Sequence, residues 1–334
     1  MGERRTLDKI NQTLRILITG GFGYLGGRIA LSLCENGHQV VLGSRKKQRT
    51  PNWLPQSEVV KLIWDDKDAL TEACRNVDAV IHAAGMNAQD CTEDPVAALE
   101  FNGVATARLV EAACKAGVNQ LIYLSTAHVY SNPLQGTVSE DTCPHNLHPY
   151  ATSHLAGEST VLHALNQKLI RNVKILRLSN AFGRPMHKDV NCWSLLVNDL
   201  CRQAVTTGKM TIKSNGTQVR DFISLSDVCS VVEHLIKKKA NHYNHHILNV
   251  GLGKSMTVLE MAKMIQARCK VVLGFDPILK HSNKEPCEQQ ERFEFCVDSL
   301  ANLGIPLEGK INWEIDELLQ SCTNWFESSL NLST

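Results

Sequence analysis

The feature that most constrains the fold is a glycine-rich turn near the N-terminus. Gly20, Gly23 and Gly26 follow the pattern Gly-x-x-Gly-x-x-Gly, between the apolar run 15–19 and a helical pattern that ends near Asn36. Glycine permits a tight turn and lets the backbone approach a phosphate, which a helix N-terminus then stabilises. In this strand–turn–helix context the pattern predicts a dinucleotide-binding loop. The loop residues expected to bind are Gly20, Phe22, Gly23, Tyr24, Leu25 and Gly26.

Strands and helices alternate along the first half of the chain. Further short apolar runs lie at 39–42, 59–64, 79–82, 120–124 and 174–178, and helical patterns at 68–75, 95–115 and 149–169. This order predicts an α/β fold with a Rossmann-type, doubly wound parallel sheet. We expect a dinucleotide-binding domain over residues 1–184, with 219–252 returning to it, and a smaller interleaved substrate-binding lobe over 185–334. Ligands of such sheets bind at the carboxyl ends of the strands.

Composition excludes several classes of function. The formal net charge of +1 argues against nucleic acid as a partner, and no apolar run approaches the about 20 residues of a membrane span. The 12 cysteines include no Cys-x-x-Cys pair, which favours free thiols in a reducing compartment and a cytoplasmic enzyme. His242, His245 and His246 lie in a polar stretch without a cysteine or carboxylate at ligand spacing, so we expect a surface loop and no metal.

The residues after the second expected strand bear on the choice of dinucleotide. An acidic residue at this point would accept hydrogen bonds from the adenosine ribose of NAD. The chain instead has Ser44, Arg45, Lys46 and Lys47. A 2′-phosphate would suit Ser44 and the guanidinium of Arg45, so NADP is favoured and NAD is the second choice. The alternative is a basic turn that only contacts solvent.

Four motifs in order carry a resemblance to a known family. They are residues 19–26, 124–130 (LSTAHVY), 176–183 (LRLSNAFG) and 216–223 (GTQVRDFI). Together they resemble the extended short-chain dehydrogenase/reductase family of nucleotide-sugar epimerases and dehydratases, from about residue 15 to residue 306. The resemblance implies a nucleoside-diphosphate sugar in the cleft and hydride exchange between a nicotinamide and a sugar carbon. It also implies a homodimer in which the helices 95–115 and 149–169 pair across a two-fold axis.

The same resemblance assigns roles to individual residues. Tyr150 matches the catalytic acid/base, Thr126 the hydroxyl that hydrogen-bonds the reacting sugar oxygen, and Asn102 the structural asparagine of the active site. His128 could be a second acid/base, although a histidine bonded to the backbone is an equal alternative. For ligand binding, the matching positions are Asp65 at the adenine, Ala83, Ala84 and Gly85 along the cofactor, and Asn180, Arg220 and Arg292 at the sugar diphosphate.

One position departs from the family. The family pattern is Tyr-x-x-x-Lys, but this chain has His154 four residues after Tyr150. Pro149 suits the first turn of a helix, so both side chains would lie one turn apart on one face. Histidine is shorter than lysine and mostly uncharged near neutrality. Three interpretations follow: a site adapted to histidine, a slow enzyme, or a non-catalytic sensor of a dinucleotide or sugar nucleotide.

The loop after the fifth expected strand limits which reactions of the family this chain is expected to catalyse. Family 4,6-dehydratases have Asp-Glu directly after the threonine, whereas this chain has Ala127 and His128, which disfavours elimination of water. We therefore predict an NAD(P)-dependent nucleotide-sugar epimerase or keto-sugar reductase, which the family places in surface polysaccharide biosynthesis. The alternatives are a reductase of a non-sugar carbonyl and the sensor.

Overall fold

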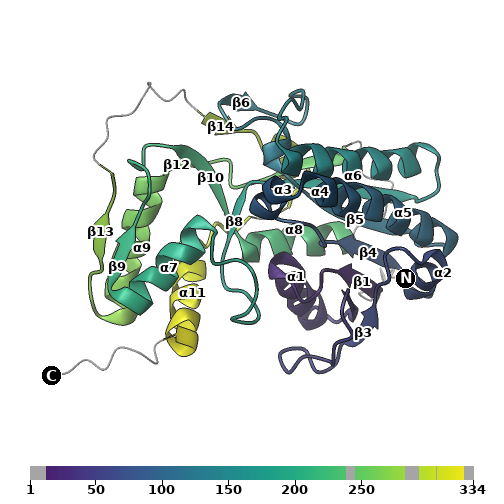
Figure 1. Cartoon of the computed structure of the whole chain (residues 1–334), viewed down its shortest axis with the longest axis horizontal. Coiled ribbons are helices and arrows are strands. Elements are labelled where there is room, and N and C mark those ends of the chain that lie inside the picture. Colours follow the sequence, from purple (N-terminus) through teal and green to yellow (C-terminus); the bar gives the residue numbers. More distant parts are fainter. Residues whose placement is uncertain (1–12, 238–244, 283–292, 306, 327–334) are drawn as a thin grey trace, which may run out of the picture.

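A seven-stranded parallel sheet forms the centre of the computed structural model, which describes residues 13–237, 245–282, 293–305 and 307–326 (Figure 1). The strand order is β11-β7-β5-β4-β1-β2-β3, and every neighbouring pair is parallel. The strands are β1 (Arg15–Thr19), β2 (Gln39–Ser44), β3 (Glu58–Lys61), β4 (Ala79–His82), β5 (Gln120–Thr126), β7 (Asn172–Leu178) and β11 (Ile247–Val250). The order reverses between β1 and β4. The predicted doubly wound, Rossmann-type sheet is thus confirmed.

Helices cover both faces of this sheet. α1 (Tyr24–Glu35) and α8 (Leu225–Lys237) pack on one face, where Ile16 and Ile18 belong to their apolar core. α2 (Lys67–Ala73), α5 (Ala105–Lys115) and α6 (Pro149–Asn166) pack on the other, where Leu17 points. Because both faces are buried, the strands read as continuous apolar runs rather than alternating ones.

The segment expected as one helix over 95–115 has three parts. After α3 (Ala88–Glu93), Asp94 caps the short α4 (Pro95–Ala98); a π-helical turn, η1 (Leu99–Val104), follows before α5 begins. A π-helical turn inserts one residue into the helical repeat and is often found at functional sites. Here it contains Asn102, so the helical pattern was recognised correctly but its interruption was not.

The smaller lobe has its own apolar core. α7 (Leu196–Thr207), α9 (Val258–Leu273) and α11 (Ile311–Phe326) enclose it together with Phe182 and Phe222 (Figure 1, left). Beside it lies the sheet β12-β10-β8, formed by Ser255–Thr257, Val219–Ser224 and Asn180–Phe182. The remaining elements are η2 (Ala127–Val129), β6 (Gly136–Val138), β9 (Lys209–Thr211), β13 (Ile278–Lys280), β14 (Phe293–Phe295) and α10 (Asp298–Asn302). No helix in the described ranges is long and apolar enough to cross a membrane.

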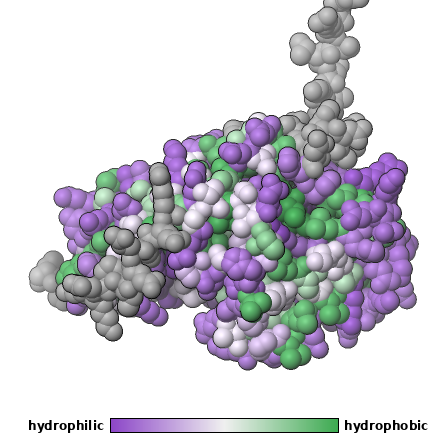
Figure 2. Space-filling model, turned by 90° about the horizontal axis from the view of Figure 1, so that it is seen from above, coloured by the Kyte–Doolittle hydropathy of each residue, from purple (hydrophilic) through white to green (hydrophobic). Residues whose placement is uncertain are grey.

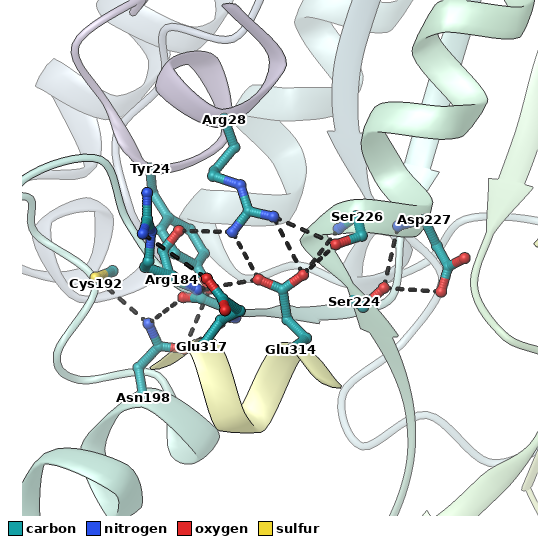
Figure 3. Close-up of polar contacts among 11 residues, drawn as sticks. Tyr24, Arg28, Arg184, Cys192, Asn198, Ser224, Ser226, Asp227, Glu314 and Glu317 are labelled. Carbon is teal, nitrogen blue, oxygen red and sulfur yellow. Dashed lines mark hydrogen bonds and ion pairs between the residues drawn. The ribbon is translucent and has the colours of Figure 1, made fainter. Parts of the chain in front are cut away.

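A buried carboxylate joins the two parts of the molecule (Figure 3). Glu314 of α11 is fully buried, and its oxygens accept from Arg28 of α1 at 2.6 and 3.2 Å. They also accept from the Arg184 N–H at 3.2 Å, the Ser226 N–H at 3.1 Å and the Ser226 hydroxyl. A Cβ at Gly183 would lie 2.2 Å from Glu314 Oε1, so only glycine fits beside it. We call this group the Glu314 cluster.

Candidate active site

A cavity of about 890 Å³ opens at the carboxyl ends of β1, β4, β5 and β7, between the sheet and the smaller lobe. This is the edge of the sheet at which the sequence places a ligand. Sixteen of the predicted site residues line it: Gly20, Phe22, Gly23, Tyr24, Leu25, Ser44, Arg45, Ala83, Ala84, Gly85, Thr126, His128, Tyr150, His154, Asn180 and Arg220. Gly26, Asp65 and Asn102 are not among the lining residues, and Arg292 lies outside the described residues.

The glycine loop has no room for side chains. Gly20 has a φ of +67°, and a Cβ there would lie 2.9 Å from the Ala83 carbonyl oxygen. A Cβ at Gly26 would lie 2.2 Å from the Gly20 carbonyl oxygen. Gly23 is the N-cap residue of α1 and supplies no side-chain cap to its first N–H groups. A narrow turn that places a helix N-terminus beside a cavity fits the pyrophosphate of a dinucleotide.

Two aromatic residues and an arginine line the cavity beside the carboxyl end of β2. The guanidinium of Arg45 lies 4.9 Å from the centroid of the Phe101 ring, which meets Trp64 edge to face at 5.5 Å. All three residues line the cavity, whereas Asp65 is exposed. Trp64 and Phe101 were missed by the sequence analysis. Trp64 immediately precedes the expected Asp65, and an aromatic residue after the third strand was the available signal.

The first turn of α6 places Tyr150 and His154 together. Pro149 occupies the start of the helix, and His148 Nδ1 accepts from the Tyr150 N–H at 3.1 Å. The rings of Tyr150 and His154 meet edge to face, with centroids 4.7 Å apart. Burial raises the pKa of Tyr150 above its ordinary value, and a hydrogen bond with Thr126 at the end of β5 acts in the opposite direction. Near neutral pH the phenol therefore carries its proton.

His154 is a neutral side chain in this structure. Its Nδ1 lies 2.9 Å from the Tyr123 hydroxyl, and burial lowers the pKa of the imidazole to about 4. Above that pH the ring is uncharged, so it places no cation beside Tyr150. A lysine at this position, which the resemblance leads one to expect, would place a positive charge beside Tyr150. If the site works with a neutral imidazole, His154 must act through a hydrogen bond and not through a charge.

Asn102 joins two of the segments that form the site. Its Oδ1 accepts from the Met86 N–H at 2.8 Å, and its Nδ2 donates to the Ser153 hydroxyl at 3.0 Å. The side chain is almost fully buried. It thus ties the loop after β4, which lines the cavity, to α6, which carries Tyr150.

A buried ion pair holds α6 one turn beyond His154. Glu158 accepts from Arg177 of β7 at 3.0 and 2.6 Å and from the Ser125 hydroxyl at 2.6 Å. The Arg177 guanidinium lies 4.7 Å from the centroid of the Tyr130 ring. Because Ser125 precedes Thr126, this pair holds β5, β7 and α6 in register next to the cavity. Sequence reasoning missed it: Arg177 stands in the motif 176–183, but nothing in the sequence pairs it with Glu158, 19 residues earlier.

The smaller lobe contributes a cation to the cavity. Burial lowers the pKa of Arg220 on β10, and burial together with the Arg220 charge lowers the pKa of His128. Asn180 donates from Nδ2 to the Asp221 carbonyl at 2.9 Å. Arg220 is thus a partly desolvated guanidinium facing a cavity, an arrangement that suits phosphate oxygens. The described residues contain no group of three or more His, Cys, Asp or Glu placed to hold a metal, and His242 lies outside them.

Known proteins resemble this chain in sequence and in fold. Residues 16–251 match the model of the NAD dependent epimerase/dehydratase family. A UDP-glucose 4-epimerase of Neisseria meningitidis serogroup C is 26% identical over 287 residues, 78% of this chain and 84% of that protein. A UDP-N-acetylglucosamine 4-epimerase from Methanobrevibacter ruminantium M1, solved with UDP-N-acetylmuramic acid, superposes with a TM-score of 0.77 at 21% identity, covering 92% of this chain and 98% of that one. MoeE5 in complex with UDP-glucuronic acid and NAD gives a TM-score of 0.76 at 22% identity, covering 93% and 99%.

Proposed function

This chain belongs to the NAD dependent epimerase/dehydratase family, and we propose that it is a nucleotide-sugar epimerase or keto-sugar reductase. The observation that carries the proposal is the arrangement around one cavity of the glycine loop, the Tyr150–Thr126 pair and the guanidinium of Arg220. Relatives named for UDP-sugars support a nucleoside diphosphate as the carrier of the sugar. Ala127 and His128 stand where dehydratases of the family have Asp-Glu, so we do not propose elimination of water.

The cavity fits a nicotinamide dinucleotide. Gly20 and Gly26 admit no side chain, and Trp64, Phe101 and Arg45 offer flat surfaces at the other end. Bound nicotinamide would exchange a hydride with a carbon of the substrate. We propose that residues 1–184, with 219–252 returning to them, hold this cofactor, and that the lobe 185–334 holds the sugar nucleotide.

Tyr150 is the proposed acid. Because its phenol lines the cavity and keeps its proton near neutral pH, it can donate that proton to a carbonyl oxygen as the carbonyl carbon is reduced, and accept it in the reverse direction. The Thr126 hydroxyl would hydrogen-bond the same oxygen. Arg220 and Asn180 would hold the diphosphate, with His128 as a neutral donor or acceptor near the sugar. Asn102 would keep the loop after β4 against α6.

Identification of a bound sugar nucleotide tests the proposal. Full-length protein purified without added ligand would be examined by native mass spectrometry, and then incubated with NAD or NADP and UDP-glucose or UDP-N-acetylglucosamine. Proton NMR should show conversion of one sugar nucleotide to its 4-epimer, or reduction of a 4-keto sugar nucleotide. If no sugar nucleotide binds or changes while a non-sugar ketone is reduced, the non-sugar reductase would replace this proposal.

A second candidate is a sensor that binds a dinucleotide or sugar nucleotide without catalysis. The neutral His154 favours it, because no cation lowers the pKa of Tyr150 from this position. The sensor predicts ligand binding with no turnover in any of the incubations above.

For the enzyme, we also propose a role in surface polysaccharide biosynthesis. The free thiols of Cys74, Cys201 and Cys322 suit a reducing compartment, so we propose that the enzyme is cytoplasmic.

The cofactor preference is the first prediction. No acidic residue stands at the end of β2, and Ser44 and Arg45 line the cavity there. We expect NADP(H) to bind more tightly than NAD(H), and Arg45→Ala to reduce the difference by about 1.5–3 kcal/mol, the contribution of a charge-assisted pair. Calorimetry with both cofactors measures it. Lys47→Ala, a nearby cation outside the lining, serves as the control, and equal affinities of the wild-type chain for both cofactors would exclude the preference.

Assembly is the second prediction. Hydrophobic residues are exposed along α4 and η1, at Val96 (69%), Leu99 (51%) and Val104 (44%). Figure 2 shows hydrophobic residues gathered at the lower right, on the side where Figure 1 places α4 and α5. We propose that a second copy of the chain covers this face in a homodimer. Light scattering at micromolar concentration should report a dimer that Val96→Glu dissociates, whereas Val271→Glu, exposed on α9, should not; a wild-type monomer would refute the dimer.

A further inference from the structure

A row of buried polar side chains runs beneath the cavity from β1 to α6. Thr19 Oγ1 lies 2.6 Å from His82 Nδ1, and His82 Nε2 lies 2.8 Å from Thr106 Oγ1. The Tyr123 ring lies beside that of His82, with centroids 5.3 Å apart, and its hydroxyl lies 2.9 Å from His154 Nδ1. All five side chains are buried. The row therefore connects the end of the glycine-loop strand to the histidine that departs from the family pattern.

Hydrogen bonds with two backbone groups determine which atoms donate and which accept in the first part of the row. The Ala84 N–H donates to Thr19 Oγ1 at 3.2 Å, and the Thr106 hydroxyl donates to the Asn102 carbonyl at 2.6 Å. A hydroxyl has one proton, and that of Thr106 is used, so His82 must donate to Thr106 from Nε2. Burial lowers the pKa of His82 to about 3, so the ring is neutral and its Nδ1 accepts from Thr19.

The Tyr123 hydroxyl has one proton and, among the described contacts, one hydrogen-bond partner, His154 Nδ1. Burial raises the pKa of its phenol well above the ordinary value, so the proton stays on Tyr123. His154 Nδ1 likewise has no other hydrogen-bond partner among the described contacts, so accepting from His154 would leave the Tyr123 proton without an acceptor. An imidazole nitrogen is also a stronger base than a hydroxyl oxygen. Donation from Tyr123 to His154 Nδ1 is the arrangement that satisfies every group.

We propose that Tyr123 is a positioning residue: by donating to His154 Nδ1, it fixes the neutral tautomer whose Nε2–H faces the cavity. The opposite edge of the ring faces Gly85, where a Cβ would lie 3.8 Å from His154 Cε1 and 3.9 Å from Nε2. Gly85 lines the cavity, so an Nε2–H at this edge can donate to an oxygen of a bound dinucleotide. A neutral imidazole then supplies the hydrogen bond, without the charge, that a lysine would supply; this rests on the cofactor site of the proposed function.

The surrounding backbone is shaped around the Tyr123 hydroxyl. Gly157 lies on α6 three residues after His154, and a Cβ there would lie 2.6 Å from Tyr123 Oη and 2.8 Å from the Asn102 carbonyl oxygen. Any side chain at this position would push the hydroxyl away from His154 Nδ1. The glycine on the catalytic helix is therefore what allows the contact.

The tautomer can be observed directly. The full-length protein would be prepared with ¹⁵N-labelled histidine, and the signals of His154, one of 13 histidines, would be assigned by their loss in His154→Asn. Long-range ¹H–¹⁵N spectra should show a protonated Nε2 and an unprotonated Nδ1 for His154. Tyr123→Phe should convert this ring to a mixture of tautomers, whereas Tyr130→Phe, which loses an equally buried hydroxyl bonded to Asn249, should leave it unchanged. A protonated Nδ1 in the wild-type chain would overturn the proposal.

A double-mutant cycle separates positioning from general structural support. Calorimetry with NAD or NADP, without any sugar substrate, should show that Tyr123→Phe weakens cofactor binding about two- to twelvefold, the equivalent of one neutral hydrogen bond. In a His154→Ala background the same substitution should have no further effect. If it weakens binding equally in both backgrounds, Tyr123 acts on the structure and not through His154. Because no turnover is measured, this outcome is independent of whether the proposed reaction is correct.

Discussion

Replacement of Tyr150 by phenylalanine is expected to lower turnover by about 10²–10⁴-fold and to leave cofactor affinity nearly unchanged. The substitution removes one hydroxyl from the cavity wall, and this hydroxyl is the group that we propose exchanges a proton with the substrate oxygen. The ring remains, so its packing against His154 at 4.7 Å is retained. Steady-state kinetics with an identified sugar nucleotide measure the first effect, and calorimetry with the cofactor measures the second.

The matched control is Tyr130→Phe. The Tyr130 hydroxyl is buried and donates to Asn249 Oδ1 at 2.7 Å, but Tyr130 does not line the cavity. We expect this variant to lose some stability and to retain most of its turnover. If Tyr150→Phe also retains turnover, Tyr150 is not the acid/base group, and the chemistry assigned to the site is incorrect.

The sequence was sufficient for the parts of the site that depend on local geometry. Gly26 lies six positions after Gly20, and a Cβ there would meet the Gly20 carbonyl oxygen, while Gly20 itself has a φ of +67°, so both of these constraints arise within the loop. Tyr150 and His154 are one helical turn apart, so their common face follows from the helical repeat alone. The parallel sheet follows from strand–helix alternation, which any βαβ chain displays.

The parts that sequence reasoning missed depend on contacts between distant segments. Glu158 and Arg177 are 19 residues apart, and Arg28 and Glu314 are 286 residues apart. Each reads as an ordinary surface charge in its own helix or strand, and only the fold shows that it is buried. The same holds for Tyr123, which looks like one apolar residue in the β5 run until its hydroxyl is seen at His154 Nδ1.

Asp65 illustrates the limit of carrying roles over by resemblance. The sequence matches the family position, yet the carboxylate is exposed and the cavity wall at this end is formed by Trp64 and Phe101. Phe101 reaches that wall from η1, whose π-helical repeat no periodicity rule predicts. The assignment of Asp65 to the adenine therefore stays a prediction, as do the roles assigned by resemblance to Asn180 and Arg292.

Glu314→Ala is expected to destabilise the chain by about 3–5 kcal/mol, the usual cost of removing one partner of a buried ion pair. Glu314 is fully buried, and the substitution would leave the Arg28 guanidinium without its counter-charge and the N–H groups of Arg184 and Ser226 without their acceptor. Such a loss is a large fraction of the about 5–15 kcal/mol that stabilises most native proteins. Urea unfolding of the full-length chain, followed by circular dichroism, measures the free energy of unfolding.

Glu317→Ala provides the comparison, because Glu317 lies one turn along the same helix, is partly exposed, and contacts Arg184 at 3.8 Å. We expect it to cost at most about 1 kcal/mol, as exposed ion pairs do. The Glu314 cluster should also affect cofactor binding, because Arg28 lies on α1, and the N-terminus of this helix follows the glycine loop that we propose binds the dinucleotide. Loss of Glu314 should therefore weaken cofactor binding at temperatures where the variant is still folded, and Glu317→Ala should not. Equal, small effects of the two substitutions on stability and on binding would show that Glu314 does not couple the smaller lobe to the cofactor loop.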